Sequence, residues 1–313
     1  MDITLHDAQD LILKGEVIAV PTETVYGLAA SLFKPDAVDK IFALKKRPSN
    51  NPLIIHVAQI SDIYPFIENP DDDFNLLANY FWPGPLTLVL PIIEAKVPAK
   101  VRANLTTAAF RIPNHPVARA LLQLTGPLVM PSANLSGRPS STSSAHVEQD
   151  FGINFPVLDG GDCLNGLEST ILYKPPSEKL YQIIRQGALT ANDFSKVLGY
   201  EPKIATSEDN KKPLCPGQLY RHYAPKAKLI ATLHFPENFN SVIIGFDERS
   251  YPQNATLYSL GSLNDPKSIS KNLYHILRKL DENNIQEALI DMNIPNRGIL
   301  TTVIERLNKA ITK

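Results

Sequence analysis

Cysteine is scarce in this 313-residue chain, which contains two, Cys163 and Cys215. Two distant cysteines exclude a disulfide-stapled scaffold and are typical of a reducing compartment. Long apolar runs are also lacking, because stretches such as residues 86–90 have only the length of a strand. Residues 1–4 show neither the basic nor the apolar region of a signal peptide. We therefore expect a soluble, cytoplasmic protein without membrane contact.

An excess of charge of either sign is absent as well. The chain has 31 basic and 32 acidic residues, a formal net charge of -1, so we expect no stable nucleic-acid binding. Metal-ligand spacing is missing too, since His56, His115, His146 and His222 form no zinc pattern with the cysteines. Cys163 is either a nucleophile served by a distant histidine or, as is commoner, an inert thiol.

What the sequence does contain is an alternation of helix-like and strand-like segments. Apolar residues at helical spacing predict helices at 7–14, 35–44, 73–81 and 116–124. Short apolar runs predict strands at 17–20, 53–57, 86–91, 108–112, 128–130, 157–158 and 170–173. The alternation predicts an α/β or α+β domain over residues 1–203.

A second, smaller unit follows a change in composition. Residues 204–213 are polar and aperiodic, which predicts a linker that we extend over 204–225. Beyond it, we expect strands at 241–246 and 288–292 and helices at 268–280 and 298–310. Residues 226–313 should therefore form a small α/β domain, large enough to fold alone.

A cluster of cations ends the second predicted helix. Lys45, Lys46 and Arg47 precede a turn rich in Pro and Asn, and the strand after it carries one polar residue, His56. Fixed cations at the mouth of an α/β layer suit a polyphosphate, because charge-assisted hydrogen bonds to phosphate are strong. The same cluster could also be a solvated helix C-terminus that complements the helix dipole, which is the commoner case. The segment alone leaves both interpretations open.

Three further features lie next to predicted strands. Thr and Glu residues at 22–24 follow the first strand, where side chains of an open sheet face ligands, although they can also cap a turn. Arg111 stands inside an apolar strand and needs an anionic partner, which is either a structural carboxylate or a substrate carboxylate. Small polar residues at 130–140 allow an anion to approach the backbone or simply stabilise a turn, and they lack Walker A spacing.

Taken in order, these segments resemble the threonylcarbamoyl-AMP synthase family in its long form. The resemblance covers residues 5–200 and the C-terminal extension. Its motifs are Pro-Thr-Glu-Thr-Val-Tyr-Gly-Leu at 21–28, Lys-x-Arg-Pro at 45–48 with Asn-Pro-Leu-Ile-Ile-His at 51–56, Trp-Pro-Gly-Pro-Leu-Thr at 82–87, Pro-Ser-Ala-Asn at 131–134 and Gly-Leu-Glu-Ser-Thr at 166–170. Residues 216–225 are similar to the segment that joins the two domains, with departures at Cys215 and at Gln218-Leu219.

The resemblance implies a fold, a reaction and a cofactor. The fold is a twisted open mixed sheet with helices (YrdC-like), then a linker and a small Rossmann-like α/β domain. L-threonine, bicarbonate and ATP give threonylcarbamoyl-AMP and pyrophosphate. Mg²⁺ is the implied cofactor, held mainly by ATP rather than by a metal site of the protein. The product would pass to a separate transferase system that forms threonylcarbamoyladenosine at position 37 of tRNA.

The resemblance also implies roles for individual residues. Lys45 and Arg47 would act as the catalytic cations on the phosphates. ATP would further contact Asn51, Thr107, Ser132, Ser140, Arg185, Tyr220 and Tyr223, the last two as candidates for a lid. L-threonine would contact Thr24, His56, Arg111, Met130 and Ser169, with Arg111 clamping its carboxylate.

Two other functions are compatible with such a site. One is an RNA-binding or ribosome-associated module, against which the near-neutral charge and the lack of paired exposed aromatics argue. The other is a carbamoyltransferase that uses a carbamoyl-adenylate, although the chain resembles none of the acylphosphatase or zinc-finger segments that accompany such domains.

Overall fold

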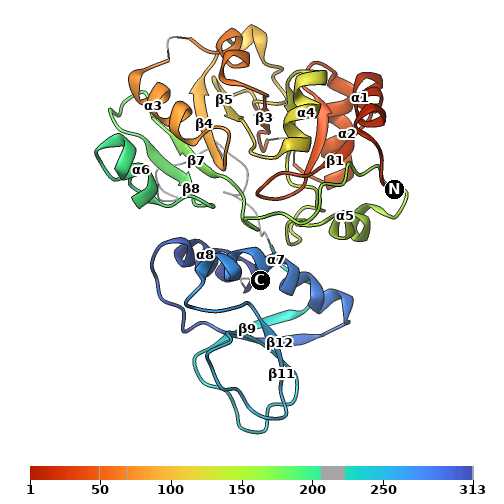
Figure 1. Ribbon diagram of the computed structural model, residues 1–313, viewed down its shortest axis with the longest axis vertical. Helices are drawn as coiled ribbons and strands as arrows, with labels where there is room; N and C mark the ends of the chain where they lie inside the picture. Colours follow the sequence, from red (N-terminus) through yellow and green to blue (C-terminus); the bar gives the residue numbers. More distant parts are fainter. Residues whose placement is uncertain (49, 69, 206–222, 312–313) are drawn as a thin grey trace.

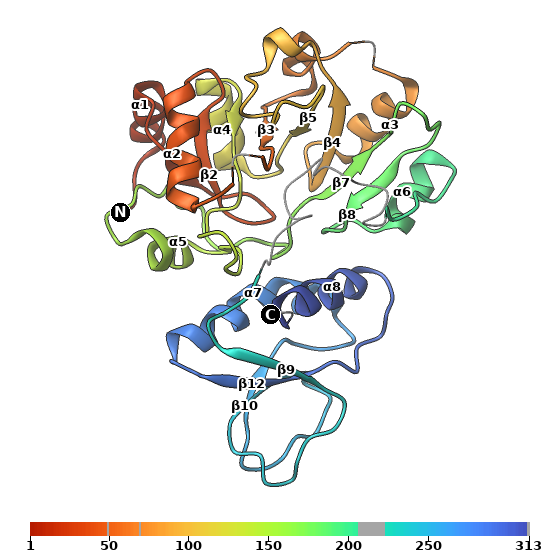
Figure 2. The same ribbon diagram turned by 180° about the vertical axis from the view of Figure 1, so that it is seen from behind.

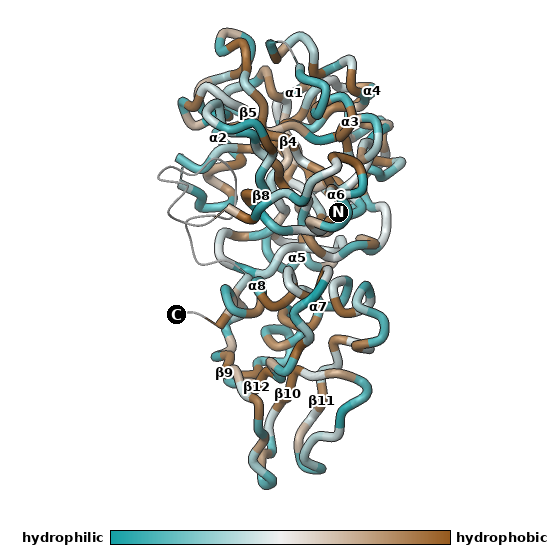
Figure 3. The backbone as a smooth tube through the Cα atoms, turned by 90° about the vertical axis from the view of Figure 1, so that its left-hand side faces the viewer, coloured by the Kyte–Doolittle hydropathy of each residue, from teal (hydrophilic) through white to brown (hydrophobic). Residues whose placement is uncertain are grey.

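The computed structural model describes residues 1–48, 50–68, 70–205 and 223–311, which form two sheet-centred domains. Figure 1 shows the larger N-terminal domain and the smaller C-terminal domain joined end to end, and Figure 2 shows the same arrangement from behind. Figure 3 shows that apolar segments run through the interior of both domains. Among the described helices, none is long and apolar enough to cross a membrane.

The N-terminal domain is built on an eight-stranded mixed sheet. Its strand order is β1-β2-β6-β3-β5-β4-β7-β8, in which β3 pairs parallel with β5 and β4 with β7, and the other pairs are antiparallel. The strands are β1 (Ile18–Val20), β2 (Gly27–Ser31), β3 (Ile54–His56), β4 (Leu86–Pro91), β5 (Thr107–Arg111), β6 (Leu128–Val129), β7 (Thr170–Tyr173) and β8 (Gln182–Arg185).

Helices cover this sheet, and local chemistry determines where they begin and end. The α-helices are α1 (Leu5–Lys14), α2 (Pro35–Lys45), α3 (Asp72–Phe81), α4 (Pro116–Thr125), α5 (Ser144–Phe151) and α6 (Ala191–Leu198), and short 3₁₀ turns lie at Ile60–Asp62, Tyr64–Phe66 and Glu94–Lys96. Thr4 and Asp7 form a capping box at the start of α1, and Gly15 ends it in the left-handed conformation. Proline occupies the first turn of α2 and of α4, where its missing N–H leaves no hydrogen bond unmade.

The C-terminal domain is a small all-parallel α/β layer. Its strand order is β11-β10-β12-β9, with every pair parallel. The elements are β9 (Lys228–Thr232), β10 (Val242–Gly245), β11 (Thr256–Ser259), α7 (Pro266–Glu282), β12 (Glu287–Asp291) and α8 (Ile299–Ile311). The Rossmann-like α/β expectation for this domain is confirmed.

Most predicted elements are present within one or two residues of their expected ends. The pairing at 157–158 is weaker than predicted, because Val157 makes only isolated bridges to Asp2 and Ala19. Apolar periodicity predicted no element at the positions of β2, β8, β9, β11, α5 and α6. The β2 sequence, Gly-Leu-Ala-Ala-Ser, contains no β-branched or aromatic residue, so its pairing with β1 and β6 overrides its local preference.

Helices α7 and α8 lie between the two sheets and form the contact with the N-terminal domain (Figure 1). Val25 and Leu167 of the N-terminal domain belong to the apolar core of the C-terminal domain. Gly166 has a φ of +68°, and a Cβ there would lie 2.5 Å from the α7 backbone. Only glycine accommodates both that conformation and that close approach. Residues of the N-terminal domain therefore pack into the apolar core of the C-terminal domain across the boundary.

Charged groups reinforce this boundary. The Arg278 guanidinium on α7 donates to Asp150 Oδ2 at 2.9 Å and to the Pro139 carbonyl at 2.6 Å. Arg138 bridges the domains, bonding to Asp150 Oδ1 at 2.6 Å and to Asp281 Oδ2 at 3.0 Å. Both oxygens of the buried Asp150 are thus satisfied, so the loop at 135–141 is tied to α7.

Buried His146, which lies beside the exposed His275 at the boundary, should make the protein sensitive to acid. His146 accepts a hydrogen bond from the Thr142 N–H at Nδ1, and its Nε2 lies 3.4 Å from His275 Nδ1. Burial, then Arg278 and His275, lower the pKa of His146 to about 3. As the pH falls, His146 is therefore protonated in the unfolded chain before it is protonated in the folded protein. The stability that is present above about pH 6.5 is lost as the pH falls toward 3.

We expect His146→Gln to reduce this loss. The free energy of unfolding, measured by urea denaturation, should decrease in both proteins between pH 6.5 and 4.5. The decrease should be smaller in the variant than in the wild type, by about 1 kcal/mol for each pH unit. His56, whose pKa is also lowered, titrates alike in both proteins and cancels in the comparison. Equal slopes would show that His146 does not contribute to the acid sensitivity.

Candidate active site

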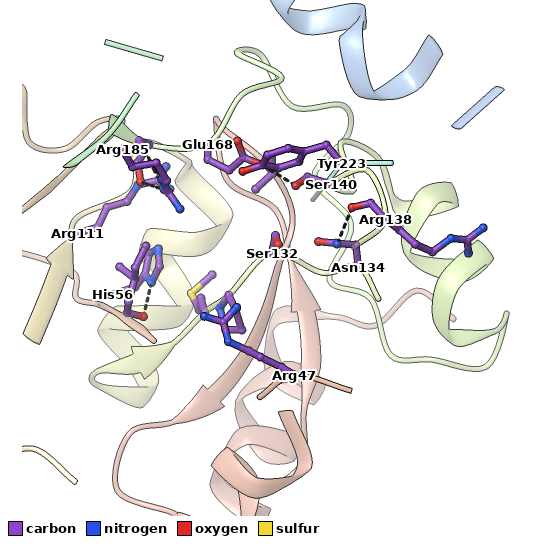
Figure 4. A pocket seen from close by; sticks show the side chains of 15 residues that line it. Arg47, His56, Arg111, Ser132, Asn134, Arg138, Ser140, Glu168, Arg185 and Tyr223 are labelled. Carbon is purple, nitrogen blue, oxygen red and sulfur yellow. Dashed lines mark hydrogen bonds between the residues drawn. The ribbon is translucent and has the colours of Figure 1, made fainter. Parts of the chain in front are cut away.

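A polar pocket lies in the N-terminal domain on the side that faces α7 and α8. Four arginines and one carboxylate contribute to its wall, which contains apolar and small polar groups as well. Figure 4 shows Arg111, Arg185 and His56 on one side and Asn134, Ser140 and Tyr223 on the other. The lining residues are Val25, Arg47, Ile54, His56, Arg111, Met130, Pro131, Ser132, Asn134, Arg138, Ser140, Glu168, Ser169, Arg185 and Tyr223.

Arg111 is the last residue of β5 and is held by an acid from the loop after β1. Its Nη2 donates to Glu23 Oε1 at 2.7 Å, and its Nε donates to the Gly84 carbonyl at 3.4 Å. Both side chains are 5% exposed, and Glu23 Oε2 also accepts the Asn114 N–H at 3.0 Å. Arg111 therefore has the structural carboxylate that its burial requires, while it still lines the pocket.

His56 ends β3 beside Arg111. Its Nδ1 lies 3.2 Å from the Ile54 carbonyl, so the neutral ring donates from Nδ1 and presents a lone pair at Nε2. Burial, then Arg111 and Arg185, hold the pKa of His56 well below its usual value. The imidazole is thus a neutral hydrogen-bond acceptor at physiological pH, suited to an amine or hydroxyl.

Ser169, just before β7, and Arg185, at the end of β8, form a connected pair. Arg185 Nη2 donates to the Ser169 carbonyl at 2.8 Å and to Ser169 Oγ at 3.0 Å. Ser169 Oγ is also 2.7 Å from Thr87 Oγ1. The two hydroxyls and the guanidinium therefore fix one another's orientation before any ligand binds.

The cation cluster divides into two different environments. Arg47 lines the pocket and donates from Nη2 to the Pro52 carbonyl at 2.9 Å. Lys45 is fully buried behind the wall, where its ammonium donates to the carbonyls of Ser132 and, at 2.7 Å, of Asn134. Burial, then Arg47, lower the pKa of Lys45 strongly. These contacts favour a role in holding the 132–134 loop, and the phosphate role of Lys45 stays a prediction.

Three other predicted residues, Thr24, Asn51 and Thr107, are buried but lie outside the described pocket wall. Thr24 Oγ1 is 2.8 Å from Thr22 Oγ1 within its own turn. Tyr220 lies outside the described residues, whereas Tyr223 lines the pocket. The pocket thus brings together Arg47, His56, Arg111, Met130, Ser132, Ser140, Ser169, Arg185 and Tyr223 among the residues predicted from sequence.

Sequence reasoning gave no role to several lining residues, of which Glu168 and Asn134 matter most. Both lie inside quoted motifs, Gly-Leu-Glu-Ser-Thr and Pro-Ser-Ala-Asn, and that was the available signal. The amide nitrogen of Asn134 donates to the carbonyls of Leu135 and Arg138, while its Oδ1 has no hydrogen-bond partner among the described residues. Asn51 Oδ1 is also buried and has no hydrogen-bond partner among the described residues. A buried amide oxygen left without a donor indicates a ligand or bound water.

Comparison with known proteins points to one group. A family model described as Sua5_yciO_yrdC, telomere recombination, matches residues 10–187. A second, described as threonylcarbamoyl-AMP synthase, C-terminal domain, matches residues 189–311. A threonylcarbamoyl-AMP synthase of Bacillus subtilis is 36% identical, over 99% of this chain and 93% of its own length. The crystal structure of Pyrococcus abyssi Sua5 complexed with L-threonine superposes with a TM-score of 0.88 and 34% identity, covering 99% of this chain and 96% of that one.

Proposed function

This chain belongs to the long-form threonylcarbamoyl-AMP synthase family and is an enzyme of that type, and we propose how its pocket performs the reaction. L-threonine, bicarbonate and ATP would give threonylcarbamoyl-AMP, pyrophosphate and water. The observation that carries the proposal is the group of Arg111, His56 and Ser169 in one pocket, in a chain 34% identical to a Sua5 that was crystallised with L-threonine. The same comparisons support the synthase over an RNA-binding module or a carbamoyltransferase.

The threonine end of the site would be the region around Arg111. Its guanidinium, oriented by Glu23, would bind the threonine carboxylate. Neutral His56 and Ser169 Oγ would accept or donate hydrogen bonds to the amine and hydroxyl. Because His56 is not protonated, it does not repel the ammonium form of the incoming amine, and the backbone at Met130 completes the wall.

The ATP end would be the region around Arg47, Ser132 and Ser140. The threonine amine captures CO₂ from bicarbonate to form a carbamate, whose oxygen attacks the α-phosphorus as pyrophosphate leaves. Negative charge then shifts onto the leaving phosphates, so Arg47 and Arg185 would stabilise it with fixed cations. Because the carbamate is unstable in water, a closed site would protect it.

Mg²⁺ is the cofactor that we propose to enter with ATP, where it would neutralise phosphate charge. Among the described residues, no group of three acidic, His or Cys side chains could hold a metal, so phosphate oxygens and water would supply most ligands. Asn134 Oδ1, which is buried at the pocket and has no hydrogen-bond donor among the described residues, would accept a hydrogen bond from a water bound to that ion. We further propose that the enzyme acts in the cytoplasm and that its product passes to a tRNA-modifying transferase system.

Pyrophosphate release by the purified protein tests the proposal. With ATP and Mg²⁺, release should require both L-threonine and bicarbonate and should fall when L-serine replaces L-threonine, while mass spectrometry detects the threonylcarbamoyl adduct of AMP. Release that ignores either co-substrate would reject the proposed reaction.

A further inference from the structure

Glu168 is the one carboxylate among the described residues that line the pocket, and the C-terminal domain binds it. Tyr274 Oη of α7 lies 2.9 Å from both Glu168 oxygens. Arg306 Nε of α8 donates to Glu168 Oε2 at 3.2 Å. Ser140 Oγ, from the pocket wall, donates to Oε1 at 2.7 Å. The carboxylate thus connects two helices of one domain to a lining residue of the other.

The charge of Glu168 depends on these partners. Burial alone would raise the pKa of its carboxyl, but Arg306, then Arg185 and the Ser140 hydrogen bond, outweigh burial and lower it. Glu168 is therefore an anion inside a site that we propose to bind polyphosphate. An unpaired anion at this place would repel ATP and would leave a buried charge without compensation.

Aromatic packing holds the C-terminal partners in place. The rings of Tyr223 and Tyr274 stack with centroids 5.3 Å apart, and the Arg306 guanidinium lies 4.8 Å from the Tyr223 centroid. Arg306 is fully buried and also donates to the Gln186 carbonyl at 2.6 Å. Tyr223 itself lines the pocket, so this cluster reaches the wall from the C-terminal side (Figure 4).

We propose that the C-terminal domain completes the catalytic pocket: Arg306 neutralises Glu168, Tyr274 helps to position it by hydrogen bonds, and Glu168 in turn orients Ser140 toward ATP. Glu168, Tyr274 and Arg306 are positioning residues rather than groups that contact the reacting atoms. The proposal rests on the synthase function and gives the C-terminal domain a specific task in ATP binding.

We call the group of Glu168, Tyr274 and Arg306 the clamp. The substitutions Arg306→Gln and Tyr274→Phe test the clamp in the two-domain protein. Arg306→Gln should raise the KM for ATP by about 30-fold or more, because it removes the main cation that compensates the Glu168 anion beside ATP. Tyr274→Phe, which keeps the stacked ring, should raise it by about three- to tenfold. In both variants, kcat at saturating ATP should change much less than the KM.

A double variant separates the clamp from general damage to the interface. If the Glu168 anion weakens ATP binding only when its partners are lost, removing its charge should help the Arg306→Gln variant. The double variant Glu168→Gln, Arg306→Gln should then have a kcat/KM for ATP at least about tenfold higher than Arg306→Gln alone. Glu168→Gln in the wild type should lower kcat/KM. If Arg306→Gln does not fold, the cycle with Tyr274→Phe gives the same comparison. Simple addition of the two losses would overturn the proposal.

Two matched controls lie in the same domain. Arg249→Gln removes the cation from the buried Asp291, an ion pair of 2.6 Å with both partners in the C-terminal domain. Tyr258→Phe removes a buried hydroxyl that accepts from Asn283 at 2.6 Å. Both should lower the melting temperature and leave the KM for ATP within about twofold. A wild type without pyrophosphate release would instead reject the synthase function, whereas ATP kinetics unchanged in the clamp variants would reject only the clamp.

Discussion

Replacement of Arg111 by methionine is expected to lower kcat/KM for L-threonine by about 10²-fold or more, with little change in the KM for ATP. The guanidinium lines the pocket and already has one carboxylate partner in Glu23. Bidentate geometry then allows a second carboxylate to be bound at fixed orientation, which a flexible methionine cannot do. Steady-state kinetics with each substrate varied in turn would measure the effect.

The difficulty with this variant is that it also breaks a buried ion pair. Loss of Arg111 leaves Glu23, 5% exposed, without its cation, which costs about 3–5 kcal/mol of stability in typical buried pairs. Glu23→Gln combined with Arg111→Met removes that stranded charge. The double variant should recover much of the lost melting temperature, but its kcat/KM for L-threonine should stay low. Recovery of both would show that Arg111 acts only as a structural partner of Glu23.

Features of this site that depend on neighbouring residues in the sequence could be predicted, whereas features that depend on residues far apart in the sequence could not. The strand ends that carry His56 and Arg111 follow from apolar runs and periodicity, which are local properties. The need of Arg111 for an anionic partner was also predictable from the cost of burial. The identity of the partner was not, because Glu23 lies 88 residues away and is brought near only by the sheet.

The orientation of side chains is a second limit on prediction. Lys45 and Arg47 are two residues apart, and composition treats them as one cationic cluster. The end of α2 turns them in different directions, because Lys46 adopts the left-handed conformation as its C-cap. Lys45 then points to loop carbonyls, whereas Arg47 lines the pocket. A helix end, rather than a residue type, decides which cation faces the ligand.

Contacts between domains are the third limit. Glu168 stands 106 residues from Tyr274 and 138 from Arg306. The motif that contains Glu168 marks it as part of a site, but a motif carries no information about partners on another domain. The packing of Gly166 against α7, which a Cβ would prevent, is what brings these partners together.

Replacement of Arg47 by alanine should have the second large effect, a decrease of about 10²–10³-fold in kcat/KM for ATP. Arg47 is a pocket cation at the end of α2, and its guanidinium is held by the backbone carbonyls of Asn51 and Pro52 at 3.3 and 2.9 Å. A fixed cation stabilises charge that develops on the leaving phosphates without reorganising during the reaction. Arg47→Lys keeps the positive charge but loses the planar set of guanidinium N–H donors. It should therefore keep only part of the kcat/KM for ATP.

Arg102 provides a matched control for that experiment. It also donates to backbone carbonyls, those of Val97 and Leu105, and pairs with Glu94 at 2.9 Å, but it does not line the described pocket. Arg102→Ala should therefore loosen its turn and leave the KM for ATP unchanged. L-threonine binding measured by calorimetry without ATP should survive in Arg47→Ala, because Arg111 and His56 remain. If Arg47→Ala lost threonine binding and ATP turnover equally, Arg47 would be holding the whole pocket together, and its assignment to the phosphates would be wrong.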